Sequence, residues 1–123
     1  MILVDTSIWV DHLRVGNQDL KYMLENGRVL THPFILGELA LRSLQQRAII
    51  LDALHGLPKA KVAEDNEVLR FIEQNRLYGI GIGYVDTHLL AAVRLSPGAS
   101  LWTLDKRLLV AANQLGLCAN LLH

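Results

Sequence analysis

The sequence is poor in the features that mark several common classes of protein. It contains one cysteine in 123 residues, so no disulfide can form within the chain, as is usual in the cytosol. Twelve basic residues balance twelve acidic ones, and this neutrality gives no electrostatic sign of a nucleic-acid or membrane partner. No apolar run approaches the roughly 20 residues of a membrane helix. The apolar start lacks a basic segment and is broken by Asp5 and Asp11, which argues against a signal peptide. We therefore expect a cytoplasmic protein that does not enter the membrane.

What is present is the composition of one globular domain. Apolar residues make up 51% of the chain and charged residues 20%, and a chain of this length can bury a single core. There is no internal repeat, low-complexity tract or linker. We therefore expect one domain that spans residues 1–123.

Short apolar runs alternate with helical patterns along the chain. The unbroken apolar run at residues 2–5 predicts a buried strand, and Thr6 or Ser7 is suited to cap the helix that follows. Further strands are predicted at residues 28–31, 59–62, 100–104 and 117–121. Helices are predicted at residues 6–13, 19–25, 34–45, 49–54, 64–77, 85–95 and 106–115. This alternation predicts an α/β fold with a central parallel sheet of about four or five strands, flanked by helices on both faces.

Two of the predicted strands end in an acidic residue. Asp5 follows "ILV", and Asp105 closes "SLWTLD" with Thr103 close by. In open parallel sheets, ligands bind beyond the carboxyl ends of the strands, where the strand order reverses. If the two strands are neighbours, their ends lie about 4.8 Å apart, close enough for both carboxylates to share one cation.

Each acid also has a purely structural interpretation. Asp5 and Asp86 stand where helix caps are common, and Glu38 can pair with Arg42 four residues on. For any one acid the structural interpretation is the more common. A cluster is harder to explain this way, because like charges about 4 Å apart repel by roughly 1 kcal/mol in water and about 4 kcal/mol at a protein surface. A hard divalent cation usually offsets such repulsion.

Several long motifs resemble one family of proteins. The stretches "ILVDTSIWVDHLR", "THPFILGELAL", "LYGIGIGYVDTHLLAAVRL" and "LWTLDKRLLVAA" resemble the PIN-domain ribonucleases, specifically the VapC-type toxins of bacterial toxin–antitoxin pairs. The resemblance covers nearly the whole chain and implies a PIN-like nuclease domain. Position by position, it implies an acidic site of Asp5, Glu38, Asp86 and Asp105, supported by the hydroxyls of Ser7 and Thr103. Relatives often carry a small residue at the position of Arg42.

The chemistry of RNA hydrolysis suits these side chains. One or two Mg²⁺ or Mn²⁺ ions held by carboxylates can activate a water and stabilise the charge of the transition state. We expect Asp5, Asp86 and Asp105 to hold the metal directly or through water, and Glu38 to orient a second metal or the attacking water. Bound cations also supply the positive charge that the neutral chain lacks.

Contacts with the rest of the RNA are less clearly marked. Arg42, Lys106 and Arg107 are candidates for flanking phosphates, although surface charges are usually only solvated. Trp9 and Trp102 are the candidate base-stacking platforms, but both lie in apolar runs that favour the core. "GIGIG" at residues 79–83 lacks the spacing of a dinucleotide-binding loop and indicates a turn before the helix that carries Asp86.

The resemblance also implies partners. These are an RNA substrate, a small DNA-binding antitoxin of the VapB type whose tail occupies the acidic groove, and a second copy of the chain in a homodimer, formed through the apolar helices between Phe34 and Leu54. Two alternatives belong to other classes. One is a non-catalytic module with the same fold that only binds a partner. The other is a phospho-accepting receiver domain, but residues 28–31 end without the acidic residue that this class requires.

Overall fold

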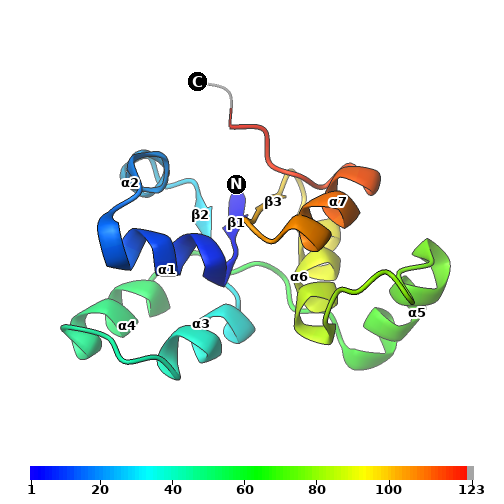
Figure 1. The fold of residues 1–123 in the computed structure, drawn as a ribbon, viewed down its shortest axis with the longest axis horizontal. Coiled ribbons are helices and arrows are strands. Elements are labelled where there is room, and N and C mark those ends of the chain that lie inside the picture. The colour runs from blue at the N-terminus through cyan, green and yellow to red at the C-terminus, as the bar shows by residue number, and fades with distance from the viewer. Residues whose placement is uncertain (122–123) are drawn as a thin grey trace.

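A small parallel sheet lies at the centre of the molecule. The computed structural model describes residues 1–121. Its three strands are β1 (Ile2–Val4), β2 (Val29–Leu30) and β3 (Ser100–Trp102), and they lie in the order β2-β1-β3 (Figure 1). Both neighbours run parallel to β1. The chain moves to one side of the central β1 to form β2 and then crosses to the other side to form β3, so the strand order reverses at the carboxyl end of β1.

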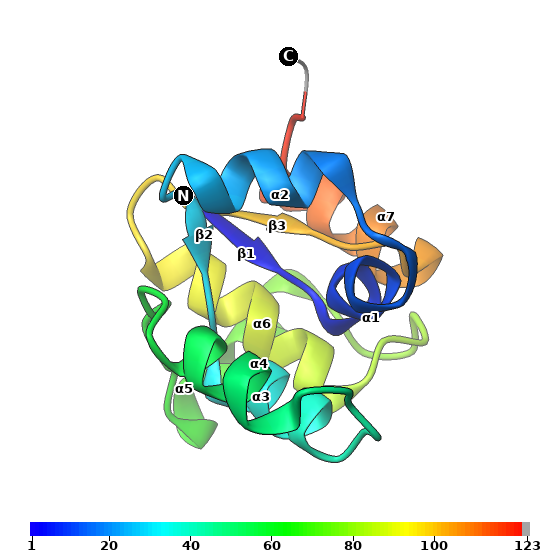
Figure 2. The ribbon, with the colours of Figure 1, turned by 90° about the vertical axis from the view of Figure 1, so that its left-hand side faces the viewer.

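Seven helices among the described residues surround this sheet. They are α1 (Thr6–Val15), α2 (Gln18–Glu25), α3 (Pro33–Ala40), α4 (Arg47–His55), α5 (Asp65–Asn75), α6 (Tyr84–Leu95) and α7 (Lys106–Gln114). The sheet has α2 on one side and α6 on the other (Figure 2). Leu3, Val4 and Leu101 are fully buried between these layers, together with Leu89 and Leu90 of α6. This is the predicted arrangement of a parallel sheet with helices on both faces. None of the helices in residues 1–121 is long and apolar enough to cross a membrane.

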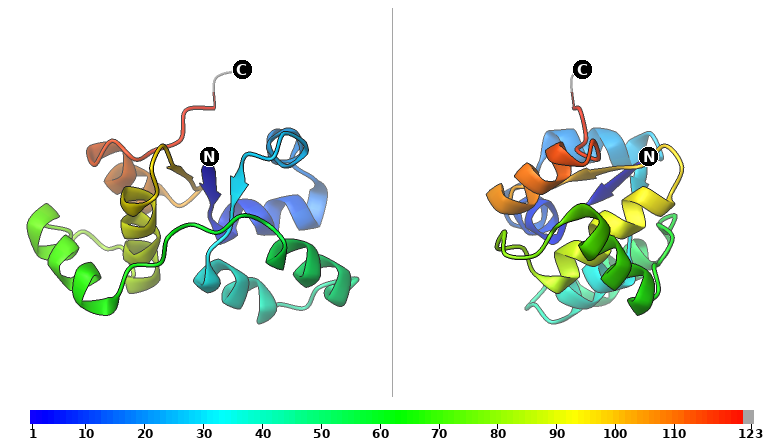
Figure 3. Two further views of the ribbon diagram at one scale, coloured as in Figure 1. Left: turned by 180° about the vertical axis from the view of Figure 1, so that it is seen from behind. Right: turned by 90° about the vertical axis from the view of Figure 1, so that its right-hand side faces the viewer.

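The helices form two groups on either side of the sheet's carboxyl end. One group contains α1, α3 and α4, and the other contains α5, α6 and α7 (Figure 1). An extended segment at residues 57–64 connects the two groups across the back of the molecule (Figure 3). Because β1 and β3 end between the groups, the residues that follow these strands face the space where the groups meet.

The predicted number of strands, four or five, is wrong for the described residues. Residues 59–62 form one isolated bridge, between Lys59 and Thr31, and residues 117–121 form one, between Cys118 and Leu101. Each bridge has two backbone hydrogen bonds, after which the chain leaves the sheet edge. The residue before Lys59 is Pro58, which has no N–H to extend the ladder. An apolar run therefore marks contact with the sheet edge without guaranteeing a strand.

The helix predicted at residues 34–45 is shorter than expected. It ends at Ala40. Leu41 continues the apolar pattern but is 90% exposed, so the pattern after Ala40 does not mark a buried helix face. The guanidinium of Arg47 donates hydrogen bonds to the carbonyls of Ala40 and Arg42. These bonds satisfy carbonyls that the ending helix leaves without partners. The next helix begins at Arg47 instead of residue 49.

Candidate active site

Two acidic residues meet at the carboxyl ends of the paired strands. Val4 lies opposite Trp102 in the β1–β3 register, and the Asp5 N–H donates to the Trp102 carbonyl over 2.9 Å. Asp105 follows β3 by three residues. The condition for a shared site, that the strands before Asp5 and Asp105 are neighbours, is therefore met.

The Asp5 carboxylate is buried and fully supplied with donors. It is only 7% exposed. Its Oδ1 accepts from the Thr6 N–H over 2.8 Å, and its Oδ2 accepts from the Ser7 hydroxyl over 2.9 Å and the Thr103 hydroxyl over 2.7 Å. These donors replace the water that a buried carboxylate loses. Asp5 also occupies the N-cap position of α1, the place predicted for Thr6 or Ser7.

The two supporting hydroxyls tie the ends of both strands together. The Thr103 hydroxyl accepts from the Asp105 N–H over 3.0 Å, and the Ser7 hydroxyl accepts from the Leu104 N–H over 3.1 Å. Each hydroxyl therefore donates to Asp5 while it accepts from the loop after β3. Asp105 in turn caps α7, because its Oδ1 accepts from the Leu108 N–H over 3.0 Å.

Glu38 is held by a residue that the sequence did not single out for this purpose. It lies on α3, and its Oε1 accepts from the Thr6 hydroxyl over 2.8 Å. The ion pairs of residues 1–121 do not include one between Glu38 and Arg42, so the helix-pair interpretation of Glu38 is not supported. The only signal for Thr6 was its place between Asp5 and Ser7, which we interpreted as a helix cap.

The charges of the other three acids affect the pKa of Asp86. It lies in the first turn of α6, where its Oδ2 accepts from the Gly83 N–H over 3.4 Å. Burial raises the pKa of Asp86, and the charges of Asp5, Asp105 and Glu38 raise it further, while the Gly83 N–H opposes the shift. The N-cap of α6 is Gly83, so the interpretation of Asp86 as an N-cap is wrong. The charges of Asp5, Asp105 and Glu38 therefore act on Asp86 in addition to its burial.

The donor set suits a hard cation, although it is not a closed cage. Among residues 1–121, no three His, Cys, Asp or Glu side chains lie close enough together to hold a metal ion by themselves. All four acids nevertheless offer carboxylate oxygens, which are the ligands Mg²⁺ and Mn²⁺ prefer. Mg²⁺ also usually keeps several waters and takes only one or two carboxylates directly. An open acidic site of this kind fits such a partly hydrated ion.

The three cationic candidates occupy two different surfaces. Arg42 lies outside the acidic group and lines a cavity of about 500 Å³ between α1 and the start of α4. Lys106 and Arg107 directly follow Asp105, in the first turn of α7. The side chain of Arg107 packs against Gly81, where an added Cβ would lie 2.6 Å from Nη1. Lys106 and Arg107 are therefore adjacent in sequence to the acids, and Arg107 contacts the loop that leads to Asp86.

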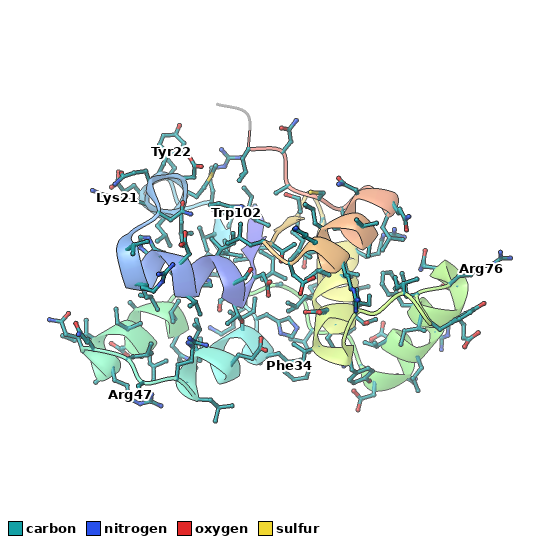
Figure 4. The ribbon with its side chains drawn as sticks, in the orientation of Figure 1. Lys21, Tyr22, Phe34, Arg47, Arg76 and Trp102 are labelled. Atoms are coloured by element: carbon teal, nitrogen blue, oxygen red, sulfur yellow. The ribbon has the colours of Figure 1, made fainter. Side chains whose placement is uncertain are left out.

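The tryptophans do not provide an open stacking surface. Trp9 is only 4% exposed, and Trp102 is half-buried and packs against the core beside β1 (Figure 4). The expected place in the core is confirmed for Trp9 and only in part for Trp102. Asp86 and His88, two residues apart on α6, have different surroundings, because His88 packs against Phe34 and Tyr84.

Comparison with known proteins gives a consistent family signal. Two curated relatives, both named Ribonuclease VapC32, come from Mycobacterium tuberculosis strains CDC 1551 / Oshkosh and ATCC 25618 / H37Rv. Each is 46% identical to this chain over 116 residues, which is 94% of this chain and 94% of the relative. No protein-family model matches the chain.

Proposed function

The chain belongs to the VapC-type PIN-domain ribonucleases, and on that basis we propose that it is the toxin of a toxin–antitoxin pair and hydrolyses RNA with the help of Mg²⁺ or Mn²⁺. The observation that carries the metal-dependent part is the convergence of Asp5, Glu38, Asp86 and Asp105. The charges of the other three acids raise the pKa of Asp86. Repulsion among these carboxylates destabilises the metal-free protein, and a bound cation offsets it.

Each acid has a role that follows from how it is held. Asp5 is fixed by Thr103 and Ser7, so it offers a carboxylate whose position does not depend on the ligand. Asp86 and Asp105 each have one oxygen on a backbone N–H, which leaves the other free for a metal or its water. Glu38 reaches in from α3 and orients the attacking water or a second metal. Supporting hydroxyls of this kind commonly fix the orientation of metal ligands.

The cation supplies an activated water and positive charge beside the scissile phosphate when it is bound among these carboxylates. Arg107 and Lys106 contact flanking phosphates from the first turn of α7. Arg42 lies on the separate cavity beside α1, so its contact with RNA requires a strand that extends past Glu38.

Two protein partners complete the proposal. The family implies a small DNA-binding antitoxin of the VapB type, whose tail covers the acidic site and so blocks RNA. A homodimer forms through the helices between Phe34 and Leu54. The dimer proposal is supported by apolar side chains that these helices leave in solvent, with Leu41 90% and Ile49 67% exposed.

Controlled expression in a bacterial host tests the proposal. The wild-type chain should arrest growth, coexpression of a neighbouring small partner gene should relieve the arrest, and sequencing of RNA ends after brief induction should reveal discrete new cuts. The Asp105→Asn variant is the matched control, because its cap is preserved while the acid is lost. Harmless expression of soluble, folded wild-type protein would instead favour the non-catalytic binding module.

A further inference from the structure

Two partly exposed aromatic rings lie together on one surface beside the acidic site. Four aromatic side chains in residues 1–121 are clearly exposed: Tyr22, Phe34, Tyr78 and Tyr84. Of these, Phe34 on α3 and Tyr84 on α6 contact the same third ring, that of His88. Their ring centroids each lie 4.8 Å from the His88 centroid, with interplanar angles of 66° and 86°.

Both rings are fixed from the protein side. The His88 residue between them is only 2% exposed, so both rings pack against a buried imidazole. The Tyr84 hydroxyl donates to Asp65 over 3.2 Å. The Phe34 N–H donates to His32 Nδ1 over 3.1 Å, and the His32 ring packs edge-on against Phe34 at 5.3 Å. Burial, with a contribution from His88, lowers the pKa of His32 to about 4, so its imidazole is neutral at pH 7 and can accept this bond.

Phe34 connects this pair of rings to the acids. Phe34 precedes Glu38 by four residues on α3, so the two side chains project from the same face of the helix. Tyr84 opens α6 two residues before Asp86, a spacing that places the two side chains on different faces of that helix, so the link between the rings and the acids runs through Phe34. Phe34 lies between α3 and the start of α6, where the two groups of helices meet (Figure 4). A strand of RNA with its phosphate at the carboxylates would therefore place a neighbouring base near these rings.

We propose that Phe34 and Tyr84 form a stacking subsite for a nucleobase next to the cleaved phosphate of single-stranded RNA. This inference rests on the proposed ribonuclease function. Every base has a π-face, so stacking on fixed rings binds single strands with little sequence preference. Rings that are already immobilised by His88, His32 and Asp65 lose little entropy when a base stacks on them. The site thus gains the aromatic platform that Trp9 and Trp102 do not provide.

Steady-state cleavage of a short, fluorescently labelled single-stranded RNA containing a cut site identified in cells tests the subsite. Phe34→Leu and Tyr84→Leu should each raise KM about tenfold and change kcat little, since a lost base–ring stack weakens binding by this order. Phe34→Tyr and Tyr84→Phe keep the ring and should retain most of the binding, although Tyr84→Phe loses the bond to Asp65. Tyr78→Leu removes an exposed ring that does not belong to the pair and serves as the matched control. Thermal melts of all variants confirm that each is folded.

A second series of substrates identifies which base of the RNA stacks on the rings. When single positions of the substrate are replaced by abasic nucleotides, one position near the cut should raise KM for the wild type but not for the two Leu variants. Unchanged KM in both Leu variants, with normal cleavage by the wild type, would refute the subsite and leave the ribonuclease proposal intact. A lower oligomeric mass of the Leu variants in light scattering would instead assign the rings to an interface between copies and refute the subsite. No cleavage by metal-loaded wild type would overturn the ribonuclease proposal and the subsite with it.

Discussion

Asp105 has a structural role and a proposed chemical role that a single substitution can separate. Its Oδ1 caps α7 through the Leu108 N–H, while its other oxygen is available to a metal or its water. Asp5 is less suitable for this purpose, because three donors converge on its two oxygens and an amide cannot accept all of them in the same way.

We predict that Asp105→Asn folds as stably as the wild type without metal, because the amide oxygen caps the helix nearly as well. Asp105→Ala should lose about 1 kcal/mol of unfolding free energy through the missing cap. At a hundredfold excess over its dissociation constant, Mn²⁺ should stabilise the wild type by about 2.7 kcal/mol and both variants much less. Urea unfolding with and without Mn²⁺ measures all three values. If Asn and wild type gain equally from Mn²⁺, Asp105 is only a cap.

The raised pKa of Asp86 leads to a pH dependence of stability. Because the pKa is higher in the folded protein than the ordinary value of 3.8, the wild type binds this proton more tightly when folded. The associated stability is fully present below pH 3.8 and is lost as pH rises through the folded-state pKa. Relative to wild type, Asp86→Asn should therefore become more stable as pH increases from about 4 to about 7 without metal. Urea unfolding over that range tests this, and a pH-independent difference would show that folding does not raise the pKa of Asp86.

At the scale of elements, the loop between α5 and α6 connects the acids to the first turn of α7. Gly79 and Gly81 both have positive φ, at 74° and 87°, but only Gly81 contacts Arg107. The contact includes the Nη1 end of a flexible side chain, so a methyl group at Gly81 can displace Arg107 without disrupting the core. Substitutions at Gly79 and Gly81 therefore distinguish the effect of backbone strain, which both share, from the effect of moving the Arg107 guanidinium, which only Gly81 has.

We predict that Gly79→Ala and Gly81→Ala lose similar stability, on the order of 1 kcal/mol, from the positive φ alone. Only Gly81→Ala should also weaken binding of single-stranded RNA and lower the slope of log K against log salt by about 0.7, as expected for one lost phosphate contact. Fluorescence anisotropy over a salt series measures both, and Arg107→Gln should reproduce the effect. The same Arg-to-Gln change at Arg76, at the far tip of α5 (Figure 4), is the control. Equal slopes for both alanine variants would mean that Arg107 does not contact RNA.

Local sequence patterns predicted some elements well and failed at others for identifiable reasons. The buried strand before Asp5 was predictable, because an unbroken apolar run is a strong local signal. Its pairing with the strand before Asp105 could only be posed as a condition, because no local pattern gives the order of strands. Residues 59–62 and 117–121 carry similar signals but form single bridges, since strand formation depends on how far the chain follows the sheet edge. Likewise, the Thr6–Glu38 bond joins residues 32 positions apart and has no local signature.

At the scale of the whole molecule, convergence of the acids depends on the topology. Each of the four acids alone fits a cap or a surface charge, and Asp5 and Asp105 do cap helices. The central position of β1 brings the ends of β1 and β3 together, while α3 and α6 approach from opposite sides. The residues alone suggested that these acids could converge, and the family resemblance assigned them position by position. The Phe34–His88–Tyr84 cluster joins α3 and α6 and had no counterpart in the sequence motifs, because it arises from packing between distant helices.

The central claim is that these four carboxylates support metal-dependent RNA hydrolysis. The most direct test is cleavage of single-stranded RNA by purified wild type and Asp105→Asn, prepared identically, in Mn²⁺ and in excess EDTA. The account predicts cleavage by the wild type in Mn²⁺, loss of cleavage in EDTA, recovery when Mn²⁺ is restored, and no cleavage by Asp105→Asn under any condition. Undiminished cleavage in EDTA, or cleavage by Asp105→Asn at the wild-type rate, would contradict it.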